Sequence, residues 1–162
     1  MNEETSKPIA SRNDFQNAVR VGFEDAAATG AAEIFLVDPD FSDWPLNEPA
    51  VVDALARWAG PHRQLLILGH SFDEMARRQA RFLEWRRQWN HLVQCRSNEE
   101  AEAVQVPTLM LIPGLVAVRL HDQIRYQGLV SGKPVDLVEC REAIDALLQR
   151  SVEAFPVTTL GL

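Results

Sequence analysis

The sequence has little of several features that would narrow its function at once. Its only two cysteines, Cys95 and Cys140, have no C-x-x-C partner and no histidines at metal-binding spacing, so neither a disulfide framework nor a zinc site is indicated. No apolar run approaches the roughly 20 residues that a membrane-spanning helix needs. Residues 1–8 are acidic where a secretory signal would be basic and then apolar. We therefore expect a cytoplasmic protein without membrane contact, metal or other cofactor.

The chain also lacks an excess of positive charge. It has 16 Lys and Arg against 23 Asp and Glu, a net charge of -7. Because phosphate contacts need a cationic surface, this balance argues against nucleic acid as a partner. The length of 162 residues fits one domain. Residues 1–10 are polar and aperiodic, which predicts a mobile N-terminal tail before a single α/β domain over 11–162.

The order of the periodic segments predicts the fold class. Helices and strands alternate in the first half, whereas the second half reads as an apolar hairpin, a further strand and a closing helix. This order favours a mixed, mainly parallel sheet with helices on both faces. Helices are predicted over 12–28, 49–59, 72–91 and 139–154, and strands over 33–37, 65–69, 92–96, 108–112, 115–120 and 124–130.

The apolar run 65–68, followed by Gly69, His70 and Ser71, is predicted to be the central strand and the turn after it. Ser71 with Glu74 three positions later is the pattern of a capping box. Because ligands of α/β folds usually bind beyond the carboxyl ends of such strands, His70 and Ser71 are candidate ligand-binding residues.

The Arg-rich helix predicted over 72–91 supplies a third candidate, Arg86, which falls within the apolar stripe of that helix. It either extends to the edge of the core, which we expect, or meets a carboxylate across the domain. The other arginines, with Trp85 and Trp89, could contact phosphates and stack on single-stranded bases, but the net charge favours a solvated cationic face. They are Arg77, Arg78, Arg81 and Arg87.

An acidic loop follows the first predicted strand. Asp38, Asp40 and Asp43 could supply oxygen ligands to magnesium or calcium, but the glycine and the bidentate glutamate of an EF-hand loop are missing. We expect these aspartates to serve turns and helix caps instead.

Gly69-His70-Ser71-Phe72-Asp73 resembles the nucleophile elbow G-x-S-x-G of α/β-hydrolases. Asp73 replaces the second glycine and would place negative charge beside a developing oxyanion. The later histidines, His91 and His121, do not occur where that family keeps its catalytic histidine. A serine hydrolase that uses this degenerate elbow is therefore the alternative to a non-catalytic role.

The order of elements also resembles one half of the phospholipase D superfamily, in particular an uncharacterised bacterial family of phospholipase D-like domains. The resemblance is carried by 35–40, by 109–114 and by the closing segment 147–162. The catalytic motif of that superfamily is H-x-K-x4-D. Val106, Thr108 and Pro113 stand at the three motif positions, and the register that starts at His121 fails as well. The resemblance therefore implies the fold without the catalysis.

These observations together predict a non-catalytic phospholipase D-like domain that serves in binding or assembly, with no catalytic residue. The superfamily's habit of pairing two halves and several tryptophans near helix surfaces suggest a homodimer as a hypothesis. The same family resemblance implies an acetyltransferase-type partner domain.

Overall fold

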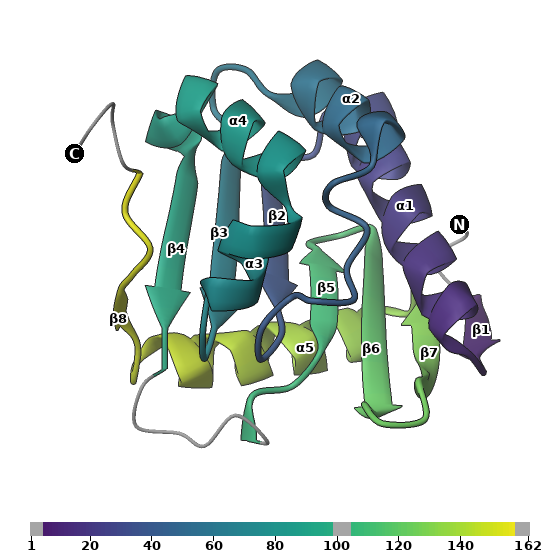
Figure 1. Cartoon of the computed structure of the whole chain (residues 1–162). Helices are drawn as coiled ribbons and strands as arrows, with labels where there is room; N and C mark the ends of the chain where they lie inside the picture. Colours follow the sequence, from purple (N-terminus) through teal and green to yellow (C-terminus); the bar gives the residue numbers. More distant parts are fainter. Residues whose placement is uncertain (1–4, 99–104, 158–162) are drawn as a thin grey trace.

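The computed structural model describes residues 5–98 and 105–157. Its centre is one eight-stranded sheet with the strand order β1-β7-β6-β5-β2-β3-β4-β8 (Figure 1). The strands are β1 (Ser6–Ile9), β2 (Glu33–Val37), β3 (Gln64–Gly69), β4 (Val93–Ser97), β5 (Leu109–Ile112), β6 (Val116–Asp122), β7 (Gln127–Ser131) and β8 (Val152–Glu153).

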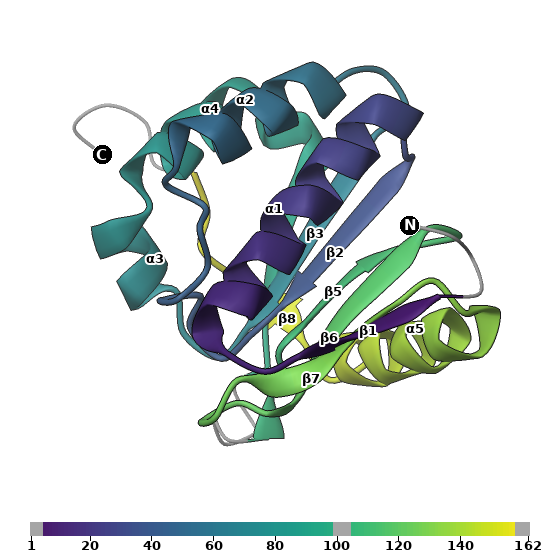
Figure 2. The same ribbon diagram turned by 90° about the vertical axis from the view of Figure 1, so that its right-hand side faces the viewer.

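Five α-helices and one short 3-10 helix are assigned within the described residues, and the α-helices cover both faces of the sheet. Figure 2 shows α1 to α4 on one face and α5 on the other. The helices are α1 (Arg12–Thr29), α2 (Pro49–Trp58), α3 (Asp73–Arg78), α4 (Ala80–Gln88), the 3-10 helix η1 (Asn90–Leu92) and α5 (Pro134–Leu148).

The predicted mixed α/β sheet with helices on both faces is confirmed. The parallel part is smaller than expected, because only the pairs β2–β3 and β3–β4 are parallel. The hairpin strands β5, β6 and β7 pair antiparallel, as do β2 with β5 and the two edge pairs. Both faces are buried along β2 and β5, and this explains why their sequences are continuous apolar runs.

Ser6–Ile9 forms β1, an edge strand paired with β7, within the segment predicted to be a tail. Ile9 alone in this strand is buried, so the sequence shows no alternation from which a strand could be predicted. Pro8 is compatible with an edge position, since an edge strand can lack one backbone donor.

The predicted helix over 72–91 is broken at Gln79 into α3 and α4. The buried side-chain amide of Gln79 donates hydrogen bonds to the backbone carbonyls of Phe41 at 3.1 Å and Trp44 at 2.9 Å. These two hydrogen bonds tie the break between α3 and α4 to the loop that follows β2. Helical periodicity does not reveal such a tertiary contact.

The last predicted helix is shifted in the structure. It begins at Pro134, which suits the first turn of a helix, and it ends near Leu148, so Val152 lies in β8 instead. The acidic segment 98–104 and the apolar tail 160–162, for which predictions were made, lie largely outside the described residues. No helix among the described residues has the length and apolar character to span a membrane.

Candidate functional site

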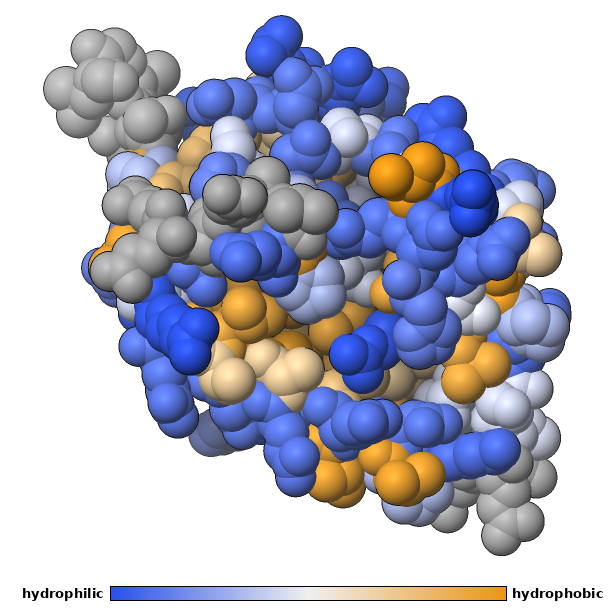
Figure 3. Space-filling model, turned by 90° about the horizontal axis from the view of Figure 1, so that it is seen from below, coloured by the Kyte–Doolittle hydropathy of each residue, from blue (hydrophilic) through white to orange (hydrophobic). Residues whose placement is uncertain are grey.

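A small polar cavity lies at the end of the two central strands β2 and β5, where β2 ends and β5 begins. We name it the Asp38 cavity; its volume is about 210 Å³. Figure 3 shows the molecule from below, the side toward which β2, β3 and β4 run in Figure 1. Hydrophilic residues predominate on this side of the molecule. Hydrophobic residues are exposed in a hollow near the middle of the view. The cavity is lined by Phe15, Asp38, Pro39, Asp40, Ser42, Asp43, Trp44, Thr108, Leu120, Gln123 and Tyr126.

Strand pairing explains why residues so distant in the sequence meet here. Val37 of β2 pairs with Leu109 of β5 in antiparallel register, so Asp38 and Thr108 flank the same end of the two strands. Thr108 Oγ1 donates a hydrogen bond of 2.5 Å to Asp38 Oδ1. The turn between β6 and β7 reaches the same edge, where Gln123 Nε2 donates to Thr108 Oγ1 at 2.9 Å.

The second oxygen of Asp38 organises the loop after β2. Asp38 Oδ2 accepts hydrogen bonds from the backbone N–H of Phe41 at 2.7 Å and of Asp40 at 3.1 Å. This pattern is that of an Asx turn, and it confirms that Asp38 serves a turn. It also holds Phe41 at a positive φ of 61°, a conformation that bulky residues adopt only when their surroundings impose it.

The opposite wall of the cavity carries a second polar group of residues. The Tyr126 hydroxyl donates to Asp43 Oδ2, and Arg12 forms an ion pair of 2.8 Å with Asp43 Oδ1. Gln16 Nε2 donates to the backbone carbonyl of Asp43 at 2.8 Å. The charge of Asp43 is therefore balanced by a cation, unlike that of Asp38.

Burial raises the pKa of the Asp38 carboxyl above its usual value, and the hydrogen bonds from Thr108, Phe41 and Asp40 lower it in part. Burial, together with the hydrogen bond to Asp43, likewise raises the pKa of Tyr126. Perturbed titratable groups that share a cavity are typical of functional sites.

Aromatic rings form the apolar part of the cavity wall. Phe15 packs edge-on against Trp44 with ring centroids 5.4 Å apart, and it lies 6.0 Å from the ring of Tyr126. Trp44 is buried, and its indole N–H makes no hydrogen bond within the described part of the chain. This N–H is near enough to the Asp38 carboxyl to lower its pKa slightly.

Aromatic side chains pack closely around Gly69 at the end of β3, the strand that precedes the predicted site. A Cβ atom built on Gly69 would lie 3.3 Å from the ring of Phe41 and 3.4 Å from that of Phe72. His70 Nδ1 lies 3.4 Å from the carbonyl oxygen of Asn98. Neither His70 nor Ser71 is among the residues that line the Asp38 cavity.

Ser71 precedes α3, but the predicted capping box does not form. Its Oγ accepts a hydrogen bond of 3.3 Å from the backbone N–H of Asp73. Glu74 pairs with Arg77 and Arg78 instead of returning to the start of the helix. No hydrogen bond between Ser71 and a histidine occurs among residues 5–98 and 105–157, so the hydrolase alternative stays a prediction without a supporting contact.

Arg86 is buried, with 5% of its surface exposed, and does not extend to the edge of the core. Its guanidinium donates to the carbonyl oxygen of Phe155 and stacks over the ring of Phe155 at 4.9 Å. It therefore anchors the segment that follows β8. The structure does not bring the three predicted site residues together in the Asp38 cavity.

Sequence reasoning missed Thr108, Gln123 and Tyr126 as site residues. Asp38 and Asp43 were considered as oxygen ligands of a metal ion and expected to serve turns and helix caps, but not as parts of a ligand cavity. Within the described residues, no group of three or more His, Cys, Asp or Glu side chains is arranged to hold a metal ion. The arrangement can instead bind a small polar molecule through fixed donors and acceptors.

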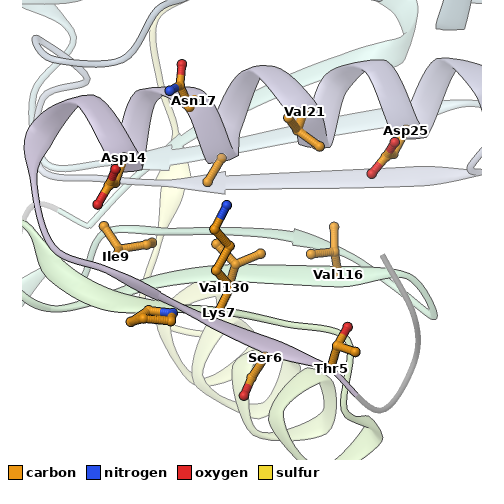
Figure 4. A pocket seen from close by; sticks show the side chains of 13 residues that line it. Thr5, Ser6, Lys7, Ile9, Asp14, Asn17, Val21, Asp25, Val116 and Val130 are labelled. Carbon is orange, nitrogen blue, oxygen red and sulfur yellow. The ribbon is translucent and has the colours of Figure 1, made fainter.

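A second, larger concavity of about 600 Å³ lies between α1 and the strands β1, β6 and β7. Figure 4 shows Lys7 and Val130 below the helix, with Asp14, Asn17 and Asp25 on the helix. Asp14 is already engaged, because its Oδ2 accepts from the N–H of Ala10. The walls are mainly apolar, and no fixed polar constellation comparable to that around Asp38 lines them.

The raised pKa of Asp38 predicts a pH-dependent stability difference between the wild type and Asp38→Asn. In the unfolded chain this carboxyl loses its proton near pH 4, whereas the folded protein retains the proton to higher pH. The folded state thus binds more protons in this window, so the carboxyl costs stability as pH rises through its folded-state pKa.

The free energy of unfolding of the wild type, minus that of Asp38→Asn, should therefore fall as pH rises from 4 to 7, by about 1.4 kcal/mol per unit of pKa elevation. Urea unfolding at several pH values measures it. Asp53→Asn, which removes an exposed carboxyl from α2, controls for the loss of one charge. A difference that stays constant or grows with pH would contradict the expectation.

Comparison with known proteins supplies a fold neighbour but no family. No protein-family model matches the chain, and no curated protein matches it. Among solved structures the fold is similar to that of TrmBL2, an archaeal chromatin protein described as showing a novel mode of DNA binding. The TM-score is 0.64 at 12% sequence identity, and the match covers 95% of this chain but only 55% of that protein.

This neighbour corrects two predictions. The assignment to a phospholipase D-like family is wrong, because the fold over nearly the whole chain is that of TrmBL2 and no family model supports the assignment. Buried apolar strands and a Pro-Gly hairpin occur in many α/β folds, so they were not diagnostic. The acetyltransferase-type partner falls with that assignment. The homodimer loses its motivation from the superfamily and stays a prediction. Net charge also does not exclude nucleic acid, since the same fold occurs in a protein that binds DNA.

Proposed function

We propose that this chain is a non-catalytic binding domain whose ligand site is the Asp38 cavity. The observation that carries the proposal is the buried Asp38 carboxyl, held by Thr108 at the wall of a polar cavity. Ligand sites of α/β folds lie beyond the carboxyl ends of parallel strands, and β2 ends at this cavity. A cytoplasmic location is part of the proposal.

The composition of the cavity wall supports binding over catalysis. The lining contains no histidine, cysteine or lysine. Its two hydroxyl-bearing residues other than Tyr126 are Ser42 and Thr108, and Thr108 already donates its proton to Asp38. Neither is hydrogen-bonded to a histidine within the described ranges, so the nucleophile and base pair that hydrolytic chemistry needs is not assembled.

Binding in the cavity is testable through Tyr126, the only tyrosine of the chain. We expect at least one of four compounds of similar size to shift the ring signals of 13C-labelled Tyr126 saturably in NMR titrations. The four are butan-1-ol, butyramide, butyrate and butylammonium. The cavity-blocking variant Ser42→Phe should abolish the shift, whereas Ser6→Phe on the edge strand β1 should not.

If none of the four compounds shifts the signals at concentrations up to tens of millimolar, or if Ser42→Phe binds as well as the wild type, the cavity is not a ligand site. The residue Asp38 would then have only its structural role in the turn.

DNA binding is a second candidate, favoured by the likeness to TrmBL2. Arginines of α3 and α4 offer a cationic surface. Arg77 and Arg78 are exposed, although both pair with Glu74, and Arg87 lies 3.8 Å from Glu84. Exposed pairs of this kind are weak, so phosphates could compete for the arginines.

This candidate predicts that the chain retards duplex DNA in a gel at low salt, with an affinity that falls steeply as salt rises. Arg77→Ala with Arg78→Ala should weaken the retardation. Arg57→Ala, which removes an exposed, ion-paired arginine from α2, should not. Absence of retardation at low salt, or equal retardation by all variants, would remove DNA binding through α3 and α4.

A further inference from the structure

Resting on the proposed function, we infer that the Asp38 cavity takes a small organic cation, namely an ammonium or guanidinium group on a short apolar stem. The inference names the ligand class of the site, which the proposed function leaves open.

Asp38 has no cationic partner among the described residues. Asp38 is only 9% exposed, and no lysine, arginine or histidine forms an ion pair with it in the described part of the chain. Its hydrogen-bond donors are neutral: the Thr108 hydroxyl and the N–H groups of Phe41 and Asp40. Buried carboxylates in proteins are ordinarily paired with a cation or coordinate one. Within the described ranges the site therefore lacks a cationic partner for Asp38.

The described residues around Asp38 add negative charge to the cavity and no cation that is free to pair with Asp38. Asp40 also lines the cavity, and the partner of its Oδ1 is the neutral N–H of Ser42. The indole N–H of Trp44 lies close to the Asp38 carboxyl without completing a hydrogen bond. Arg12 neutralises Asp43 alone. A ligand that enters the cavity with a positive charge would gain from Asp38 and Asp40 together.

The walls of the cavity indicate which kind of cation would bind. Phe15, Trp44 and Tyr126 contribute aromatic surface to the walls, and aromatic faces attract organic cations. A hard metal ion would need several oxygen ligands at close range, and the acidic side chains described here do not converge in that way. The mixed wall of carboxylates and rings thus favours an ammonium or guanidinium group.

The volume of the cavity limits the size of the ligand. This volume is about 210 Å³. It is below the range of ~300–1,000 Å³ typical of pockets for drug-sized ligands. Asp38 Oδ1 accepts the hydrogen bond from Thr108 at the wall of this cavity, so the carboxyl is within reach of a small ligand. A short-chain amine fits these limits.

The test compares three compounds that differ in charge at nearly constant shape: butylammonium, butan-1-ol and butyrate, each titrated at pH 7 against 13C-labelled Tyr126. We expect butylammonium to bind about tenfold more tightly than butan-1-ol, the difference between a charge-assisted and a neutral hydrogen bond, and butyrate not to bind. Asp38→Asn should reduce the affinity for butylammonium about tenfold, and Asp53→Asn should leave it unchanged.

Butan-1-ol or butyrate binding as tightly as butylammonium would overturn the inference and leave the proposed function standing. Magnesium chloride that competes equally with butylammonium would overturn the choice of an organic cation. If none of the three compounds, nor butyramide, binds, both proposals fail. If Asp38→Asn does not fold, the comparison of the three compounds on the wild type decides alone.

Discussion

The buried carboxyl of Asp38 joins three parts of the chain at one edge of the sheet. Its hydrogen bond with Thr108 connects the end of β2 to the start of β5, and its bonds to the backbone of residues 40 and 41 shape the following loop. A hydrogen bond to a charged group contributes about 1.5–3 kcal/mol. No cation balances this carboxyl in the described structure. The hydrogen bonds that order this end of the sheet therefore leave the Asp38 carboxyl without a cationic partner.

The loop ordered by Asp38 contributes Phe41 and Trp44 to a row of aromatic rings. Phe41 packs on Trp44 and stacks on Phe72, and Phe72 stacks on Phe155 with ring centroids 5.2 Å apart. Phe41 and Phe72 of this row lie close to Gly69, and the row ends under the guanidinium of Arg86. The Asp38 cavity lies at the end of β2, the strand next to β3, after which the sequence places His70 and Ser71.

Local patterns predicted the elements well where the periodicity was strong. The helix of residues 12–29 and the strands around 33–37 and 64–69 follow from apolar spacing, since one face or both must be buried. The break at Gln79 was not predictable, because its cause is a pair of carbonyl groups more than 30 positions away. The Asp38 cavity, which we propose as the ligand site, was not predictable for the same reason: Asp38 and Thr108 are 70 positions apart, and only the register of β2 with β5 brings them together. His70 and Ser71 have the residue types of a site, but the aromatic rings around Gly69 were outside the reach of sequence reasoning.

The role of Asp38 is tested most sharply by titrating its carboxyl carbon by 13C NMR, in the free protein and with saturating butylammonium. The account predicts that the pKa in the free protein lies above the ordinary value of an aspartate and falls when the ammonium binds, because a nearby cation favours the charged form. A pKa at or below the ordinary value in the free protein, or one that butylammonium leaves unchanged, would contradict the account.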